Sequence, residues 1–317
     1  MPASLRNTNL VPRPIAQSGA RVVSKRVYPG LTGLLRGNQP DRRKWGRSLI
    51  CAIEEYLARA REQYCRVAHG DLSGSSLLLE DWYLPLKVRA STAKKPIIID
   101  HFNKRLFSAH KPILLIGPPG TGKTMLLRFT FLACLKENGG IPFFVKLGRL
   151  SSKTTVWDVI RQELSANDHA IDNRRLARLV RYGGFVFLLD GLNEIVPAHR
   201  EKVIAQILDF ISMANRNHFI LAVRPDTPRI PNLDFQSFTI EPLALAEAFE
   251  LMRRHDGNGA LSRYIITKVE RNPSKHLRRF LTNPLRVSML YKSYELMRRH
   301  RSTLQVAPNH TRRKQQR

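Results

Sequence analysis

The sequence predicts an α/β protein in which a parallel β-sheet is sandwiched by helices and followed by a small helical subdomain. Between residues 112 and 241, apolar strand-like runs alternate with helical runs, as in a parallel sheet covered on both faces. A glycine-rich loop stands between the first of these strands and the first helix. After Pro242 only helical patterns follow. We therefore assign the sheet domain to residues 111–243 and the helical subdomain to residues 244–300.

Five runs are predicted to be strands, because they are apolar on both faces: residues 113–116, 142–147, 185–189, 219–223 and 235–240. Apolar residues at helical spacing predict the helices. Those of the sheet domain are expected at 123–136, 156–164, 174–181 and 200–213, and those of the subdomain at 245–255, 261–271, 275–281 and 285–300.

Residues 47–110 are predicted to form a helical N-terminal region that leads into the sheet domain. From Leu49 to Tyr64, apolar residues recur on one helical face, which indicates a long amphipathic helix. Short strand-like pieces at 77–79 and 83–88 and a helix at 98–108 are expected to follow.

The net charge is unusually high. The 317 residues include 53 Lys and Arg against 25 Asp and Glu, which gives +28. Residues 1–46 hold nine of the basic residues and one acid, and residues 298–317 hold seven and no acid. We expect a disordered basic arm at 1–46 and a basic tail at 301–317. Such a field favours polyanions, so these tails make nucleic acid a candidate partner, although paired arginines on helices are equally typical of solvated faces.

The three cysteines are odd in number and lack CxxC spacing. This pattern indicates neither a disulfide framework nor a zinc site, and it favours a reducing, cytoplasmic location. No apolar run approaches the roughly 18 residues that a membrane span needs, so no transmembrane segment is predicted.

An eight-residue loop carries the strongest chemical signal. It matches the phosphate-binding pattern G-x-x-x-x-G-K-[ST] and directly follows the strand at 113–116. Glycines let successive N–H groups point at one anion, and the following helix adds its positive N-terminal end. The pattern assigns the lysine to the β- and γ-phosphates and the threonine hydroxyl to Mg²⁺. The sequence therefore predicts a P-loop NTPase with ATP and Mg²⁺ as ligands, bound by Gly117, Pro118, Pro119, Gly120, Thr121, Gly122, Lys123 and Thr124.

Two other strands end in charged residues. The apolar strand at 185–189 runs into Asp190, the arrangement of a Walker B motif, and Asp190 is predicted to ligate Mg²⁺. Glu194 is the candidate for polarising the attacking water, with an ordinary surface acid as the alternative. The strand at 219–223 runs into Arg224. Ligands collect at the carboxyl ends of open α/β sheets, so Arg224 is expected within reach of a γ-phosphate. The alternatives are an ordinary solvated arginine and an ion pair with the neighbouring Asp226.

Together these segments resemble the NACHT domains of the STAND branch of P-loop NTPases. GPPGTGKT at 117–124, FVFLLDGLNEI at 185–195 and FILAVRP at 219–225 look like the Walker A, Walker B and sensor 1 segments in the family's order. FLTNPLRVSML at 280–290 is similar to the helical segment whose proline lies near the adenine, which would be Pro284. The resemblance covers roughly residues 80–300. It implies Mg-ATP binding, a conformational or oligomerisation switch, and a role in defence signalling.

Two departures from the family pattern bear on function. The family has an acidic pair where this chain has Asn193 before Glu194, so hydrolysis is expected to be slow. The family also continues into a winged-helix domain and sensor repeats beyond the point that corresponds to Arg317. Three readings stay open: a minimal switch, a subunit completed by a partner chain that supplies winged-helix, sensor or effector parts, and a fragment of a longer protein. Self-association is the further expectation for a switch.

The alternative is a DNA-associated AAA+ ATPase, such as a replication loader or a transposition helper. The charge of +28 favours it. Against it, no clear sensor 2 arginine stands at AAA+ spacing, the candidates being Arg278 and Arg286. A third reading is a nucleotide-binding scaffold with negligible turnover.

Overall fold

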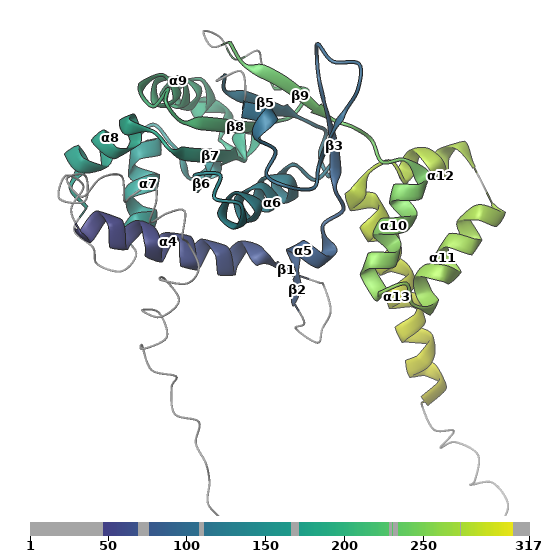
Figure 1. Cartoon of the computed structure of the whole chain (residues 1–317). Coiled ribbons are helices and arrows are strands. Elements are labelled where there is room, and N and C mark those ends of the chain that lie inside the picture. Colours follow the sequence, from purple (N-terminus) through teal and green to yellow (C-terminus); the bar gives the residue numbers. More distant parts are fainter. Residues whose placement is uncertain are drawn as a thin grey trace, which may run out of the picture.

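The computed structural model describes residues 47–68, 76–107, 111–165, 171–227, 230, 234–272 and 274–306. It confirms the predicted fold class: a seven-stranded sheet lies between helices, and a helical subdomain stands beside it (Figure 1). The expected basic arm at 1–46 lies outside the described residues, as do residues 307–317 of the expected tail.

Five parallel strands form the body of the sheet. In spatial order they are β9 (Gln236–Ile240), β5 (Ile113–Ile116), β8 (His218–Val223), β7 (Phe185–Asp190) and β6 (Ile141–Lys146). Each begins within one residue of its predicted start. Since parallel strands point the same way, the segments that follow β5, β7 and β8 meet at one edge of the sheet.

The sheet has two further strands within residues 47–110, and the first of them overlaps the strand-like piece expected at 83–88. β3 (Leu86–Ala90) pairs antiparallel with β9, and β4 (Ile97–Ile99) pairs antiparallel with β3. The helix expected at 98–108 is wrong. Three consecutive isoleucines prefer the extended backbone of a strand, and only the short 3₁₀ turn η1 (Lys104–Phe107) follows. Before β3 lie the hairpin strands β1 (Arg66–Ala68) and β2 (Ser76–Leu78) and the short helix α5 (Leu79–Trp82).

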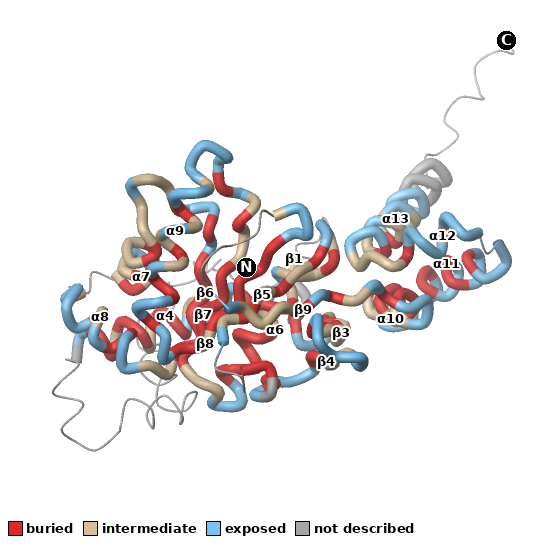
Figure 2. Tube along the Cα trace, turned by 90° about the horizontal axis from the view of Figure 1, so that it is seen from above, coloured by how far each residue is buried: buried red, intermediate tan, exposed pale blue. Residues whose placement is uncertain are grey.

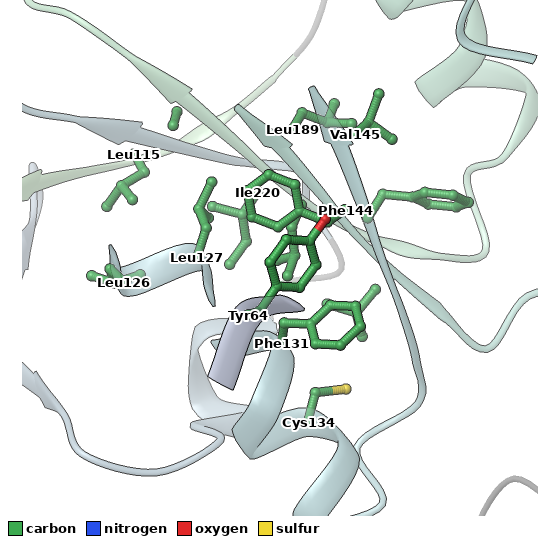
Figure 3. Close-up of a cluster of buried hydrophobic side chains, with 14 of the residues drawn as sticks. Tyr64, Leu115, Leu126, Leu127, Phe131, Cys134, Phe144, Val145, Leu189 and Ile220 are labelled. Atoms are coloured by element: carbon green, nitrogen blue, oxygen red, sulfur yellow. The ribbon is translucent and has the colours of Figure 1, made fainter. Parts of the chain in front are cut away.

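Helices cover both faces of the sheet (Figure 1). α6 (Lys123–Lys136) is apolar nearly all round and packs against the sheet, with Leu127 and Phe131 among the buried side chains in Figure 3. On the opposite face, Phe210 of α9 (Pro197–Met213) meets the ring of Phe187 edge-on, with centroids 5.0 Å apart. α7 (Val156–Leu164) and α8 (Asn173–Tyr182) complete the cover.

The predicted N-terminal helix, α4 (Arg47–Cys65), protects an edge of the sheet. β6 is the edge strand, and its Phe144 N–H donates a hydrogen bond of 2.8 Å to the Tyr56 hydroxyl. The Tyr56 ring also stacks on Phe143 at 4.2 Å. An exposed edge strand presents unpaired N–H groups, and α4 supplies a partner for one of them. The helix therefore belongs to the same folded unit as the sheet.

The helical subdomain contains α10 (Leu245–Asp256), α11 (Ala260–Arg271), α12 (Lys275–Phe280) and α13 (Pro284–Val306). α10 packs against both α11 and α13, whereas α12 buries no residue and lies on the rim (Figure 2). α13 extends to Val306 and so includes the first residues of the expected tail. Among the described helices, none is both long and apolar enough to span a membrane. The three cysteines form no disulfide with one another.

Candidate functional site

The glycine-rich loop turns sharply between β5 and α6. Gly120 and Gly122 have φ angles of 78° and 94°, in the left-handed region that favours glycine. Lys123, the first residue of α6, folds back so that its Nζ donates hydrogen bonds of 2.6 Å to Gly117 O and 2.9 Å to Pro118 O. The first N–H groups of a helix have no partner within it. The loop therefore presents N–H donors and an ammonium at one place, which suits an anion.

Thr124 and Asp190 are in direct contact. The Thr124 hydroxyl donates a 2.7 Å hydrogen bond to Oδ2 of Asp190. Asp190 is the last residue of β7, and the register places β7 next to β8. The structure thus brings together the two residues that the sequence predicts as metal ligands.

Arg224 lies at the same edge of the sheet. It directly follows β8, and the carbonyl of the preceding residue, Val223, accepts a 3.2 Å hydrogen bond from Gly117 N–H at the start of the loop. Burial lowers the pKa of Lys123, and the charge of Arg224 lowers it further, whereas Asp190 and Asp226 oppose this shift. All three charged groups are therefore close enough to act on the loop lysine.

The Glu194 carboxylate is turned toward Gly148 and Gly191. Glu194 lies in the 3₁₀ turn η3 (Leu192–Glu194), where its N–H donates to Gly191 O at 2.9 Å. Its carboxylate folds back between Gly191 and Gly148, so that a Cβ atom on Gly148 would come within 2.9 Å of Glu194 Oε2. Glu194 is exposed and sits beside the sheet edge that carries Asp190.

A cavity of about 380 Å³ opens beside the loop, within the size range of small-molecule sites. Gly120, Gly122, Lys123 and Thr124 line one side of it. Pro284, which resemblance places near an adenine, lines the side formed by the helical subdomain. The remaining wall is mainly apolar and includes Trp82, Tyr83, Leu86, Leu251 and His255.

The helical subdomain is hydrogen-bonded to the loop at the N-terminus of α13. Asn283 Nδ2 donates to Pro119 O at 2.9 Å, and Leu285 N–H donates to Gly120 O at 3.1 Å. Asn283 Oδ1 also caps α13 by accepting from the N–H groups of Leu285 and Arg286. A Cβ atom on Gly120 would lie 2.8 Å from both Asn283 Oδ1 and Leu285 Cβ, so the close approach requires glycine.

Several of these residues were not predicted from the sequence. Asn before Pro is a helix N-cap signal, which would have found the cap at Asn283 but not its bond to a loop 164 residues away. Trp82 and His255 carry no motif, and they reach the cavity from α5 and α10. Their rings meet edge-on, with centroids 5.5 Å apart.

Neither candidate for a sensor 2 arginine lines this cavity. Arg278 borders a separate small cavity together with Glu270 and Ser274. The guanidinium of Arg286 lies over the Phe280 ring, 5.7 Å from its centroid.

The arrangement fits a magnesium nucleotide. Mg²⁺ takes oxygen ligands and usually binds through one or two protein groups together with phosphates, and the adjacent oxygens of Thr124 and Asp190 are of this kind. The loop and Lys123 present donors for phosphates, and the mainly apolar cavity can take a base.

Part of the chain is similar to a known domain family. Residues 111–258 match the sequence profile of the NACHT domain. No curated protein sequence matches the chain.

Similar solved structures include a DNA replication initiation factor (18% identity, TM-score 0.38), Drosophila ORC bound to DNA (17%, 0.38) and the replication initiator DnaA bound to AMPPCP and single-stranded DNA (15%, 0.37). The matched regions cover 62%, 62% and 63% of this chain and 60%, 53% and 61% of those chains, respectively. The chain therefore spans less than two thirds of the length of these proteins.

Proposed function

Because residues 111–258 form a NACHT domain, a P-loop NTPase domain of the STAND type, we propose that the protein binds Mg-ATP, hydrolyses it slowly and acts as a nucleotide-dependent switch. The switch would change the conformation or the self-association of the chain.

One observation carries this proposal. The cavity has the phosphate-binding loop on one side and α10 and α13 of the helical subdomain on the other. A nucleotide bound there touches both parts of the protein. The hydrogen bonds from Asn283 and Leu285 to the loop provide a direct path between them.

Each charged residue has a distinct role in this proposal. Lys123 exchanges its two carbonyl partners for phosphate oxygens. Thr124 and Asp190 hold Mg²⁺, which neutralises negative charge on the phosphates when bound. Arg224 contacts the γ-phosphate from the end of β8, and its planar guanidinium suits phosphate oxygens.

Glu194 is proposed to orient the attacking water and accept its proton. A carboxylate can do this, whereas the amide of the neighbouring Asn193 cannot. A single carboxylate, held back between Gly148 and Gly191, supports slow turnover. The slow step would keep the ATP-bound form populated, as a switch requires.

Nucleotide binding tests the proposal directly. We expect Lys123→Ala to abolish binding of a fluorescent ATP analogue in the presence of Mg²⁺. The matched control is Lys136→Ala, which removes the exposed lysine at the other end of the same helix. Undiminished binding by the Lys123→Ala variant would overturn the assignment of the loop.

The switch is tested by size. Wild-type protein measured by light scattering with ATP, with ADP and without nucleotide should differ in mass or in hydrodynamic radius. If mass and hydrodynamic radius are identical in all three states at saturating nucleotide, the protein is a nucleotide-binding scaffold and not a switch.

A further inference from the structure

A cluster of exposed basic residues lies on the rim of the helical subdomain. Lys275, Arg278 and Arg279 are on α12 and Arg286 is on the first turn of α13. We call these four residues the α12 cluster. Within the part of the chain that the structure describes, none of them makes an ion pair within 4.0 Å. Glu270 and Arg278 border the same small cavity, but they do not form an ion pair.

The other arginine pairs among the described residues are balanced by acids. Arg253 and Arg254 both pair with Glu250 on α10, at 3.7 and 3.2 Å. On α8, Arg175 pairs with Asp172 at 3.4 Å. The α12 cluster differs from these ordinary solvated faces because its positive charges lie together without a partner of opposite sign.

The geometry of α12 concentrates the charge on one side. Residues 275, 278 and 279 are spaced i, i+3 and i+4, so they share one helical face. Phe280 lies further round the helix, next to this face, and its ring is 36% exposed. The Arg286 guanidinium lies over that ring, so it adds a fourth positive charge beside α12. Figure 2 shows α12 as an exposed element of the subdomain.

Such a cluster favours a ligand with several negative charges in a row. Like charges on one short helix repel each other, and a polyanion relieves this repulsion. Three of the four residues are arginines, whose planar guanidinium donates two parallel hydrogen bonds to phosphate oxygens. Phe280 adds an aromatic surface on which a base can stack.

The cluster is separate from the nucleotide site. None of its four residues lines the cavity beside the phosphate-binding loop. A membrane surface suits it less well, because an interfacial helix needs an exposed apolar face. On α12 the side chain of Leu277 packs against the core, and Leu281, which follows the helix, is 1% exposed. Phe280 is therefore the single exposed apolar side chain of this helix, too little for an apolar face.

We propose that the α12 cluster binds the sugar-phosphate backbone of a nucleic acid strand. Lys275, Arg278, Arg279 and Arg286 contact successive phosphates, and Phe280 stacks on a neighbouring base. The contacts are to the backbone and to a ring face, so they carry no sequence preference.

Fluorescence anisotropy with a labelled oligonucleotide tests this proposal in the full chain. The probes are a mixed-sequence single-stranded DNA of about 20 nucleotides and its duplex, titrated from about 50 to about 300 mM NaCl. The test variant is Arg278→Gln/Arg279→Gln. The matched control is Arg174→Gln/Arg175→Gln, which removes the same charge from adjacent arginines on α8, at the opposite end of the molecule (Figure 1).

We expect the Kd of the test variant at physiological salt to rise about tenfold or more, and the slope of log K against log salt to fall by about 1.4 to 1.8 because two phosphate contacts are lost. The control variant should keep the wild-type slope. Unchanged ATP binding by both variants would show that they are folded.

Two outcomes would overturn the proposal. One is that the two double variants bind DNA equally well and with equal salt slopes. The affinity for DNA would then come from the total charge of the chain or from residues outside the α12 cluster. The other is binding of wild-type protein to phosphatidylserine vesicles but not to either oligonucleotide at physiological salt.

Discussion

The Thr124 hydroxyl donates a 2.7 Å hydrogen bond to Oδ2 of Asp190, joining the first turn of α6 to the end of β7. If both oxygens hold Mg²⁺, then Thr124→Val and Asp190→Asn should each raise the Mg²⁺ concentration needed for ATP binding by about tenfold or more. Their effects should not add in the double variant, because both act on one ion. The measurement is ATP-analogue binding as a function of Mg²⁺ concentration.

Thr130→Val is the control for this pair. It makes the same substitution on α6 at a buried hydroxyl that has no hydrogen-bond partner among the described residues, and it should leave the Mg²⁺ dependence unchanged. Additive effects of Thr124→Val and Asp190→Asn would contradict a shared ion.

Much of the fold could be predicted from the sequence, because local patterns of residues determine which segments are strands and which are helices. The apolar runs of β5, β7 and β8 and the helix at 123–136 follow from residues within each segment. The strand pairing of residues 86–99 was not readable. Val88 pairs with Ile240, about half the chain away, and no local signal specifies that partner.

Some residues of the site could likewise be predicted from the sequence, and others could not. Lys123, Thr124, Asp190 and Arg224 could be placed because a strand end fixes where the next residue lies. Asn283 could not be placed, since its bond to Pro119 depends on how the helical subdomain docks. The motif likewise gave no sign that Glu194 would fold back toward Gly148.

Glu194→Gln should separate ATP binding from hydrolysis. The amide keeps the size of the side chain but cannot accept a proton from water. We expect ATP to bind with wild-type affinity and turnover to fall by about 100-fold or more. Phosphate release under saturating Mg-ATP measures this. The control is Glu201→Gln, which changes an exposed acid on α9 and should retain full turnover. If Glu194→Gln hydrolyses ATP at the wild-type rate, another group orients the attacking water.

Arg224→Ala should distinguish ATP from ADP. A guanidinium that contacts only the γ-phosphate contributes a charge-assisted hydrogen bond to ATP and none to ADP, so ATP affinity should fall about tenfold or more. Arg216→Ala is the control, because Arg216 lies before the opposite end of the same strand, β8. Calorimetric titration with each nucleotide gives the comparison. Equal losses for ATP and ADP would exclude a γ-phosphate contact.

ATP affinity should depend on pH through Lys123. Burial and the charge of Arg224 lower the pKa of its ammonium in the free protein, and bound phosphates raise it again. The affinity for ATP is therefore highest at pH values below the pKa that Lys123 has in the free protein. It falls as the pH rises toward the higher pKa that Lys123 has in the complex. Within that window, ATP binding takes up protons. Titrations from about pH 8 to about pH 10 should show the loss.

Lys123→Arg is the control for pH, because arginine stays charged over this whole range. Its ATP affinity should be independent of pH, whatever its absolute value. The same pH dependence in Lys123→Arg and in wild-type protein would assign the titration to another group.

Asn283 should couple the nucleotide to the helical subdomain. Its Oδ1 caps α13, and its Nδ2 bonds to Pro119 O in the phosphate-binding loop. Serine caps helices about as well as asparagine, but its side chain is too short to reach Pro119. Asn283→Ser should therefore keep the thermal stability of the wild type while losing the link. Asn283→Ala, which removes the cap as well, should lose about 1 kcal/mol of stability.

The readout for coupling is protection of the subdomain by nucleotide. Hydrogen exchange in the first turns of α13 should slow when ATP binds to wild-type protein, and it should respond less in Asn283→Ser. Asn272→Ser is the control, since Asn272 follows α11 and, among the described residues, its side chain donates a hydrogen bond to Lys268 O within that turn. An undiminished response in Asn283→Ser would mean that the signal passes instead through the backbone bond from Leu285 to Gly120, or through the nucleotide itself.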